Sequence, residues 1–251
     1  MINVLISGAL GKMGKKVFSA CSENSNVKAV CGVDIKEDFS NPDFPIYSDF
    51  DSVKEKVDVV IDFSSTLNFD RLTAYISKNK IPSVLCATGY SEEQTAMIKE
   101  LSSKVAIFRS ANMSVGVNLL VTLVKSASLA LNGFDIEITE MHHNKKVDAP
   151  SGTALMLAEA IKSVLPEKFF LYGREGKVGA RTKDEIGIHA LRGGNVVGEH
   201  EVIFAGENEI IKLSHSAQDR SVFADGAVKA SEYIFTKSNG LYDMSDMING
   251  K

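Results

Sequence analysis

The first half of the chain alternates short apolar runs with segments of helical periodicity. The apolar runs are rich in Val and Ile and end in small or polar residues; they cover 2–6, 27–34, 57–64, 82–89 and 105–112. Segments of helical character lie between them, at 15–23, 68–80 and 91–104. Continuous apolar strands separated by helices predict βαβ units and a parallel sheet. Ligands of such sheets bind outside the carboxyl ends of the strands, so the residues that follow each run are of most interest.

After about residue 113 the pattern changes to alternation typical of half-buried strands. Phe134, Ile136 and Ile138 share one face of the segment 134–143, and polar residues occupy the other. Further strand-like segments joined by glycine-rich turns lie at 185–206 and 208–217, and a helix is expected at 153–165. The most apolar stretch, 115–133, carries Asn118 and Lys125, so it predicts a buried helix and not a membrane span.

The two patterns together predict an α/β protein of two domains. The first is a Rossmann-like doubly wound parallel sheet domain, and the second is an α+β domain with a mixed or antiparallel sheet. The helical stretch at 224–237 is expected to return to the first domain, because the second half has little else for it to cover. The predicted boundaries are 1–113 with 224–251 for the first domain and 114–223 for the second.

A glycine-rich turn follows the first apolar run and favours a dinucleotide site. The turn reads GALGKMG from Gly8 to Gly14, with Ala9 where the G-x-G-x-x-G fingerprint has its first glycine. Gly11 allows close approach of a pyrophosphate to the backbone, and Gly14 allows close packing of helix and strand. Such turns also occur without a ligand, but the second apolar run ends at Asp34, where a carboxylate can accept hydrogen bonds from ribose hydroxyls. We therefore expect NADH, NADPH or both as cofactor.

The choice between the two cofactors stays open at this stage. Asp34 disfavours the extra phosphate of NADPH by charge repulsion, whereas Lys12 and Lys36 stand nearby and can offset it.

Composition and charge exclude several other classes of protein. The chain has 251 residues, of which 44% are hydrophobic and 24% charged, and its formal net charge is −4, so neither a nucleic-acid nor a membrane partner is indicated. The three cysteines show no CxxC spacing, which is typical of reduced thiols in a cytoplasmic protein. The first ten residues lack the basic region of a signal peptide.

The stretch 140–154, EMHHNKKVDAPSGTA, is the strongest candidate for chemistry. His142 and His143 end a predicted strand, so their side chains point to opposite faces and cannot do the same work. Lys146 follows in a short loop, and the helix start at Gly152 and Thr153 offers backbone N–H groups and a hydroxyl that suit a carboxylate or a phosphate.

Simpler interpretations of this stretch exist. Each feature alone is more often structural: a surface histidine pair, solvated lysines, an ordinary helix cap. Metal binding is disfavoured, because the two rings diverge and no Cys, Asp or Glu stands at ligand spacing. The co-occurrence of all the features within a dozen residues favours acid–base chemistry beside an anion site. Glu140 could orient a ring, and His189, His200 and His215 are interpreted as structural.

These residues closely resemble the signature of the dihydrodipicolinate reductase family, whose reaction is now described as that of 4-hydroxy-tetrahydrodipicolinate reductase. The resemblance covers nearly the whole chain; it includes GALGKMG at the start, SANMSVGVN at 110–118, GGNVVGEHEVIFAG at 193–206, FADGAVKA at 223–230 and the closing GLYDM. It implies a cytoplasmic homotetramer of lysine and diaminopimelate biosynthesis. In this family NADH or NADPH reduces a small cyclic dicarboxylate, with loss of its 4-hydroxyl as water.

The resemblance also implies roles for individual residues. His142 resembles the general acid/base, Lys146 its cationic partner, and substrate contacts are implied for His143, Gly152, Thr153 and Thr88. The implied cofactor-binding residues are Gly8, Ala9, Leu10, Gly11, Lys12, Met13, Asp34, Ala87, Thr88, Gly89, Ser110, Ala111, Asn112 and Met113. The first predicted domain would bind the dinucleotide, and the second would bind substrate and make the oligomer contacts.

Departures from the family pattern keep two alternatives open. Ala87 stands where the family often has a threonine, the segment after Asp62-Phe63 reads SSTLN without the usual proline, and the chain is somewhat short. The alternatives are another amino-acid-pathway dehydrogenase, resembling aspartate dehydrogenase, and a dinucleotide sensor without turnover.

Overall fold

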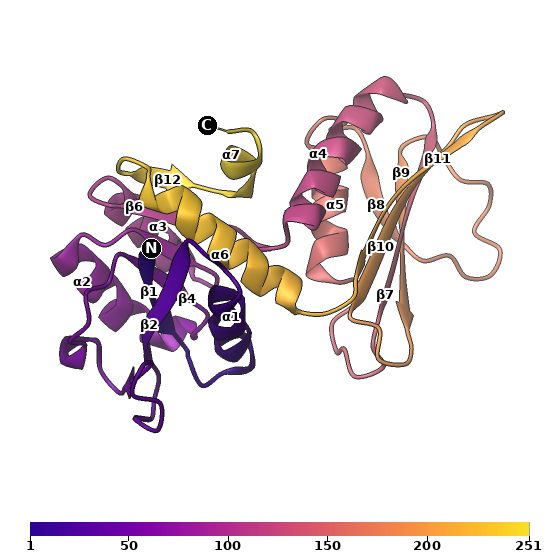
Figure 1. Cartoon of the computed structure of the whole chain (residues 1–251). Helices are drawn as coiled ribbons and strands as arrows, with labels where there is room; N and C mark the ends of the chain where they lie inside the picture. The colour runs from indigo at the N-terminus through magenta and orange to yellow at the C-terminus, as the bar shows by residue number, and fades with distance from the viewer. Residues whose placement is uncertain (251) are drawn as a thin grey trace. The chain divides into compact units, whose positions relative to one another are not determined.

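The computed structural model describes residues 1–250 and divides into two compact units. Unit 1 comprises Met1–Val115 and Arg220–Lys251, and unit 2 comprises Gly116–Asp219. The chain therefore begins and ends in unit 1 and forms unit 2 from its middle (Figure 1).

Unit 1 is built on a parallel sheet of seven strands, in the order β12-β6-β5-β4-β1-β2-β3. The strands are β1 (Ile2–Ser7), β2 (Val27–Val33), β3 (Ile46–Tyr47), β4 (Val59–Asp62), β5 (Ser83–Leu85), β6 (Ala106–Arg109) and β12 (Gly240–Tyr242). The helices of this unit are α1 (Lys12–Ser22), α2 (Phe69–Asn79), α3 (Glu92–Ser102), α6 (Ser221–Phe235) and α7 (Met244–Ile248). The predicted doubly wound parallel sheet is confirmed.

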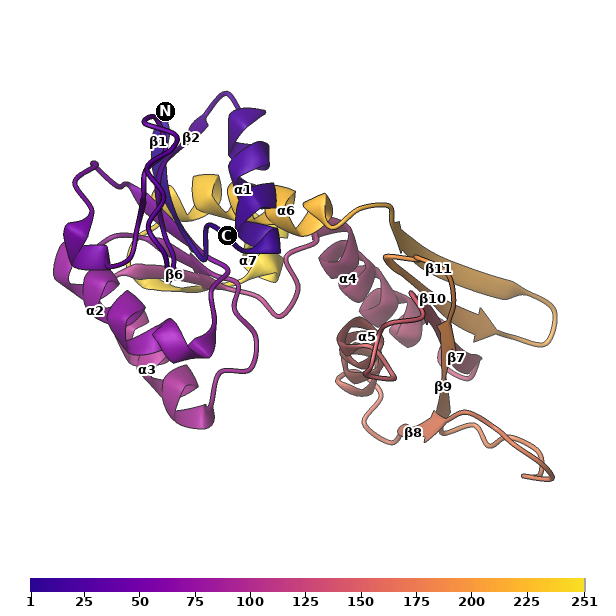
Figure 2. The ribbon, with the colours of Figure 1, turned by 90° about the horizontal axis from the view of Figure 1, so that it is seen from below.

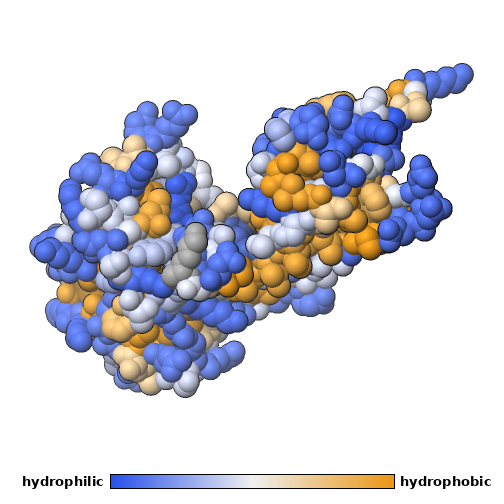
Figure 3. Space-filling model, turned by 90° about the horizontal axis from the view of Figure 1, so that it is seen from above, coloured by the Kyte–Doolittle hydropathy of each residue, from blue (hydrophilic) through white to orange (hydrophobic). Residues whose placement is uncertain are grey.

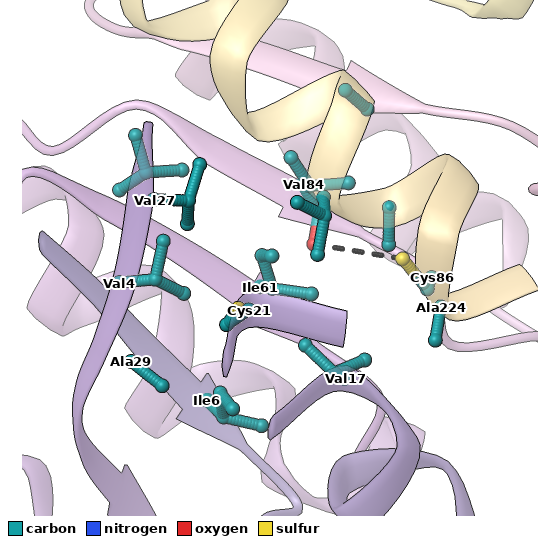
Figure 4. Packing of buried hydrophobic residues seen from close by; sticks show 14 of the residues in the cluster. Val4, Ile6, Val17, Cys21, Val27, Ala29, Ile61, Val84, Cys86 and Ala224 are labelled. Carbon is teal, nitrogen blue, oxygen red and sulfur yellow. Dashed lines mark hydrogen bonds between the residues drawn. The ribbon is translucent and has the colours of Figure 1, made fainter. Parts of the chain in front are cut away.

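Alternate residues of the strands of unit 1 supply two separate cores. Val4 and Ile6 of β1 belong to one core, together with Val17 of α1 and Ala224 of α6 (Figure 4). The second core contains Leu5, which lies between Val4 and Ile6 in β1, together with buried residues of α2 and α3. Both faces of the sheet are thus covered, which is why its strands read as continuous apolar runs.

Unit 2 contains a mixed sheet of five strands, in the order β11-β10-β7-β9-β8. Strand β10 pairs antiparallel with β7 and with β11, whereas β9 pairs parallel with β7 and with β8. The strands are β7 (Asp135–His142), β8 (Phe169–Tyr172), β9 (Glu185–Arg192), β10 (Gly198–Ala205) and β11 (Ile210–Ala217). The predicted α+β character of this half is confirmed, although β8 was not foreseen.

Helices α4 (Val115–Ala130) and α5 (Gly152–Lys162) cover only one face of this sheet (Figures 1 and 2). Ile136 and Ile138 of β7, Leu157 of α5 and Val124 of α4 pack together in the core between them. The opposite face carries the polar half of the alternating strand pattern, as that pattern predicts.

The prediction of a buried helix at 115–133 is only half right. Leu120 and Val124 of α4 are buried, but Leu119, Leu123 and Leu129 are 45%, 46% and 60% exposed. Apolar side chains accordingly gather on the surface of unit 2 (Figure 3). One side of the helix is enough to fill the core, so the apolar residues on its other side stay at the surface. Within residues 1–250, no helix combines the length and apolar character required to cross a membrane.

Candidate active site

The glycine-rich turn of unit 1 forms a tight connection between β1 and α1. Gly8 has a φ of +80°, a conformation that favours glycine, and its N–H donates to the Val33 carbonyl at 2.8 Å. The Gly11 N–H donates back to the Gly8 carbonyl at 3.1 Å, and α1 begins at the next residue. Gly11 is the N-cap of α1 but has no side chain to cap it, so the helix start is open to an acceptor from outside.

Gly8 and Gly14 cannot carry side chains without rearrangement of this turn. A Cβ at Gly14 would lie 2.2 Å from the Gly8 carbonyl oxygen, and one at Gly8 would lie 2.9 Å from the backbone of Phe63 and Ser64. Both obstacles are backbone atoms, which cannot rotate away. The two glycines therefore allow the close contact between helix, turn and the end of β4 that a dinucleotide fold requires.

Asp34 follows β2 and holds the same turn by its side chain. Its Oδ2 accepts a hydrogen bond from the Leu10 N–H at 2.8 Å, and its Oδ1 accepts one from the Ile35 N–H at 2.7 Å. Asp34 lines a cavity of about 700 Å³ together with Gly8, Leu10 and Gly11. The structure thus brings the predicted glycine turn and the predicted acidic residue together around one cavity.

Two basic side chains also line this cavity, Lys36 after β2 and Arg71 in the first turn of α2. The sequence interpretation considered Lys36 and Lys12 but missed Arg71. Arg71 lies inside a helical segment far from the glycine turn in the sequence, so no local pattern assigns it to the cavity.

Five of the other predicted cofactor residues meet at a second cavity of unit 1, about 450 Å³ in volume. Ala87, Thr88 and Gly89 after β5 line it, together with Ser110 and Ala111 after β6. The carboxyl end of the chain contributes Leu241, Tyr242 and Asp243, which the sequence interpretation did not include.

Asn112 and Met113 do not line this cavity. The Asn112 side chain accepts a hydrogen bond from the Ser114 N–H at 2.8 Å, and Met113 is 3% exposed within the core of unit 1.

In unit 2 the apolar face of β7 ends in two polar residues. Ile136, Ile138, Glu140 and His142 are all buried, whereas the residues between them are half-buried. Across the sheet Glu140 pairs with His200 of β10, and His142 pairs with Arg192 of β9. The register therefore gathers two imidazoles, a carboxylate and a guanidinium at one end of the covered face.

Glu140 is the centre of this cluster, because its buried carboxylate accepts four hydrogen bonds. The His142 Nδ1 lies 2.6 Å from Oε2, and the Ser151 N–H donates to Oε1 at 2.9 Å. The Arg192 guanidinium donates to both oxygens, at 2.8 Å each. Burial raises the pKa of Glu140, but the hydrogen bonds from Arg192 and His142 outweigh burial and shift the pKa downward.

An ionised carboxylate can only accept hydrogen bonds, so the hydrogen between Glu140 and His142 belongs to Nδ1. The Nε2 atom of His142 is then the one that can gain or lose a proton. A Cβ at Gly198 would lie 3.0 Å from that Nε2, so the glycine leaves room beside it.

Lys146 is connected to the same cluster through its loop. Its Nζ forms an ion pair of 2.8 Å with Asp148, whose backbone carbonyl accepts a hydrogen bond of 2.7 Å from Arg192. Burial excludes four-fifths of the Lys146 side chain from solvent. The cation predicted from the sequence thus lies within the hydrogen-bond network of Glu140 and His142.

His200, interpreted from the sequence as structural, lies against the His142 ring and the start of α5. Its ring packs edge-on against that of His142, with centroids 5.1 Å apart, and its Nε2 lies 2.9 Å from the Ser151 hydroxyl. Burial, followed by the nearby His142, lowers the pKa of His200 to about 4. His200 therefore stays neutral near neutral pH, next to a histidine that can exchange protons. By contrast, His189 lies on the other face of the sheet and contacts Glu137 at 2.7 Å.

The start of α5 adjoins this cluster. Ser151 caps the helix by accepting a hydrogen bond from the Ala154 N–H, while helix geometry leaves the Gly152 N–H without an acceptor inside the helix. Gly152 is exposed, and no atom lies within 4 Å of where its Cβ would be. His143 follows β7 and donates its backbone N–H to the Val196 carbonyl at 2.8 Å.

No group of three His, Cys, Asp or Glu residues that could hold a metal ion occurs in the described part of the chain. In the acid–base cluster, sequence reasoning missed Arg192. Arg192 comes directly before the GGNVV segment and belongs to no local motif. Only the pairing of β9 with β7 brings it to Glu140.

A doubly wound parallel sheet with a glycine turn, joined to an α+β unit with a buried acid–base cluster, defines a two-domain oxidoreductase of the dinucleotide-dependent class. The chain belongs to the dihydrodipicolinate reductase family. The model of the family's N-terminal domain matches residues 2–113, and that of its C-terminal domain matches residues 116–248.

Individual proteins agree with this assignment. The chain is 54% identical over 249 residues to a 4-hydroxy-tetrahydrodipicolinate reductase of Caldanaerobacter subterraneus subsp. tengcongensis, covering 99% of this chain and 98% of the relative. It is similar to a dipicolinate-bound dihydrodipicolinate reductase from Paenisporosarcina sp. TG-14, with a TM-score of 0.82, 28% identity and 97% coverage of both chains. Aspartate dehydrogenase from Thermotoga maritima shares only the fold, with a TM-score of 0.53 and 15% identity over 95% of this chain and 98% of that one.

Proposed function

We propose that this protein reduces 4-hydroxy-tetrahydrodipicolinate to tetrahydrodipicolinate with NADH or NADPH, in lysine and diaminopimelate biosynthesis. The observation that carries the proposal is the buried Glu140–His142 pair, which lies in one network with Lys146 and the start of α5. The network supports the proposal because it would put a proton donor beside groups that suit a carboxylate, in a chain of this reductase family.

Unit 1 would hold the cofactor. The open start of α1 would receive the pyrophosphate, and Asp34 would accept hydrogen bonds from the adenosine ribose. Ala87, Thr88, Gly89, Ser110 and Ala111 would line the nicotinamide side. The glycine contacts support this fit, since a side chain at Gly8 or Gly14 would disrupt the turn. When bound, the reduced cofactor supplies the hydride for C4 of the substrate ring.

Unit 2 would bind the substrate and manage its protons. Lys146, His143 and the N–H groups at Gly152 and Thr153 would hold the ring carboxylates, because cations and helix N-termini favour anions. Loss of the 4-hydroxyl as water leaves a conjugated imine. Addition of hydride at C4 then leaves an electron pair that a proton must quench.

His142 is the residue that we expect to supply this proton. Glu140 fixes the hydrogen on Nδ1, so Nε2 carries the transferable proton of the imidazolium, and Gly198 leaves space beside it. A positioned acid of this kind contributes about 10²–10⁴ in rate.

We also propose that the protein is a cytoplasmic homotetramer, as the family resemblance implies. The face of the unit 2 sheet that α4 and α5 leave uncovered is the surface that we expect to meet other subunits (Figure 2). Light scattering coupled to size-exclusion chromatography measures the number of subunits directly, and a monomeric mass contradicts this part of the proposal.

The enzymatic proposal is tested by oxidation of NADH, and separately of NADPH, with substrate generated in situ from pyruvate and aspartate semialdehyde by a coupled synthase. We expect turnover that falls at least about a hundredfold in His142→Gln. Oxidation of aspartate without activity on the dicarboxylate would favour the aspartate-dehydrogenase-like alternative. Cofactor binding without any turnover would favour a dinucleotide sensor.

A further inference from the structure

Arg192 contacts both parts of the proposed catalytic apparatus. Through Glu140 it reaches the Nδ1 of His142, and through the Asp148 backbone it reaches the loop that carries Lys146. No other side chain in the described structure donates to Glu140 and also to the loop between β7 and α5. This double contact is built from distances of 2.7 to 2.8 Å, so it fixes position as well as charge.

We infer that Arg192 is a positioning residue that couples the proposed acid/base His142 to the proposed cation Lys146. The inference rests on the proposed function for the roles of those two residues. Arg192 itself is not expected to touch the substrate, since its contacts are to Glu140, to Asp148 and to its neighbour Leu191.

The orientation of His142 depends on this arginine. The Glu140 carboxylate is completely buried, and two of its four hydrogen bonds come from Arg192. Without Arg192 the carboxylate loses half of its donors and is free to rotate or to take up water. His142 would then lose the fixed partner that holds its Nδ1 hydrogen and aims its Nε2.

The charge on His142 depends on it as well. With Arg192 present, the negative charge of Glu140 is balanced by a cation other than the imidazolium. With Arg192 removed, the unbalanced carboxylate stabilises the protonated form of His142 to higher pH. The groups that face His142 or its partners are Glu140 on β7, Arg192 on β9, His200 on β10, His215 on β11, Ser151 at the start of α5, and Lys146 and Asp148 in the loop.

Neither neighbouring histidine compensates for a missing arginine. Burial lowers the pKa of His200 to about 4 and also lowers that of the half-buried His215. Both rings are neutral at the pH of a physiological assay, so neither supplies the positive charge that Glu140 would lack. Glu140 therefore relies on Arg192 for its permanently charged hydrogen-bond partner.

The test compares the pH profiles of kcat for the wild type, Arg192→Gln and Arg192→Lys, with Arg174→Gln as a matched control. Arg174 forms a similar two-pronged pair with Glu137 of the same strand, at 3.0 and 2.9 Å, on the face away from His142. In Arg192→Gln we expect kcat to fall about tenfold to a hundredfold, the usual cost of removing the support behind a functional histidine in metal sites. We also expect the alkaline limb of the profile to move up by about one pH unit.

Arg192→Lys separates charge from geometry. It keeps the cation but loses the two-pronged contact, so the alkaline limb should stay close to that of the wild type while kcat still falls. Arg174→Gln should leave the profile unchanged even where it lowers thermal stability. The inference would be overturned if the pH profiles of kcat of both Arg192 variants, scaled to the same maximum, superimposed on that of the wild type. Such profiles would indicate loss of structure alone.

A second measurement does not depend on turnover. Nitrogen-15 NMR of the imidazole rings reports which nitrogen of His142 carries the hydrogen and the midpoint at which the ring titrates. We expect the Nδ1–H form in the wild type and a midpoint about one unit higher in Arg192→Gln. If the wild type fails to turn over but the NMR shift is present, the proposed function is wrong and the coupling stands. If turnover is normal and the midpoint is unmoved, the coupling is wrong.

Discussion

The buried, neutral His200 predicts a specific loss of stability in acid. Its pKa lies near 4 in the folded chain, compared with an ordinary value of 6.5. Between these two values the unfolded chain binds more protons than the folded one, so the free energy of unfolding rises with pH in this window. The stability is fully present above pH 6.5, is lost as the pH falls and reaches its minimum below pH 4.

The size of the effect follows from the same two values. At about 1.36 kcal/mol per pKa unit, the complete loss is about 3 kcal/mol, and at pH 5 it is about 2 kcal/mol. Glu140, whose pKa is also lowered, acts in the same direction, since its stabilising charge is lost as the pH falls. A variant that changes only His200 is needed to separate the two contributions.

His200→Gln is that variant, because glutamine places a polar group near the Ser151 hydroxyl and does not titrate. Urea unfolding followed by circular dichroism at pH 8 and at pH 5 gives the difference in free energy between variant and wild type. At pH 8 this difference measures the change in packing and in the contact with Ser151, without any contribution from titration of His200. At pH 5 we expect the unfolding free energy of the variant, taken relative to that of the wild type, to be about 2 kcal/mol higher than at pH 8. A difference that is the same at both pH values would refute the assignment of a low pKa to His200.

Three further variants test the two proposed binding sites. Lys146→Ala should lower turnover by about a hundredfold or more and leave the dissociation constant for NADH, measured by fluorescence, nearly unchanged; a collapse of NADH binding contradicts a substrate-side role. Asp34→Ala should weaken NADH more than NADPH in the same titration, because NADPH gains from the loss of a nearby negative charge; equal losses contradict the ribose contact. Gly14→Ala places a Cβ 2.2 Å from the Gly8 carbonyl oxygen, so we expect a loss of about 1–3 kcal/mol in unfolding free energy together with weaker NADH binding; unchanged affinity contradicts the proposed role of the turn.

The Rossmann-like half was predictable because its determinants are local. A buried parallel strand shows itself as a short apolar run, and the ligand-facing residues come immediately after it. The position of Asp34 beside the glycine turn could be predicted in this way from one segment of sequence. Its hydrogen bond to the Leu10 N–H, by contrast, depends on how two adjacent turns pack and was not predictable.

The acid–base cluster was predictable only along β7. His142 and Lys146 lie in one short stretch, and the even-numbered stripe that contains Ile136 and Ile138 already extends to Glu140. Arg192 and His200 lie on two other strands, and their place beside Glu140 follows from strand register alone. Register between distant strands is set by the packing of the whole sheet, which a single sequence does not state.

The path of the chain through its two units has a consequence for synthesis on the ribosome. Helix α6 packs on α1 and on strands β4, β5 and β6 of unit 1, and β12 completes the edge of its sheet beside β6. Both elements are among the last to be made, after all of unit 2. Residues 1–115 therefore emerge with only α1 on the face of the sheet that α6 later covers, and part of that face stays exposed until α6 has been made. A premature stop near residue 220 would leave a finished unit 2 attached to a first unit that lacks its covering helix.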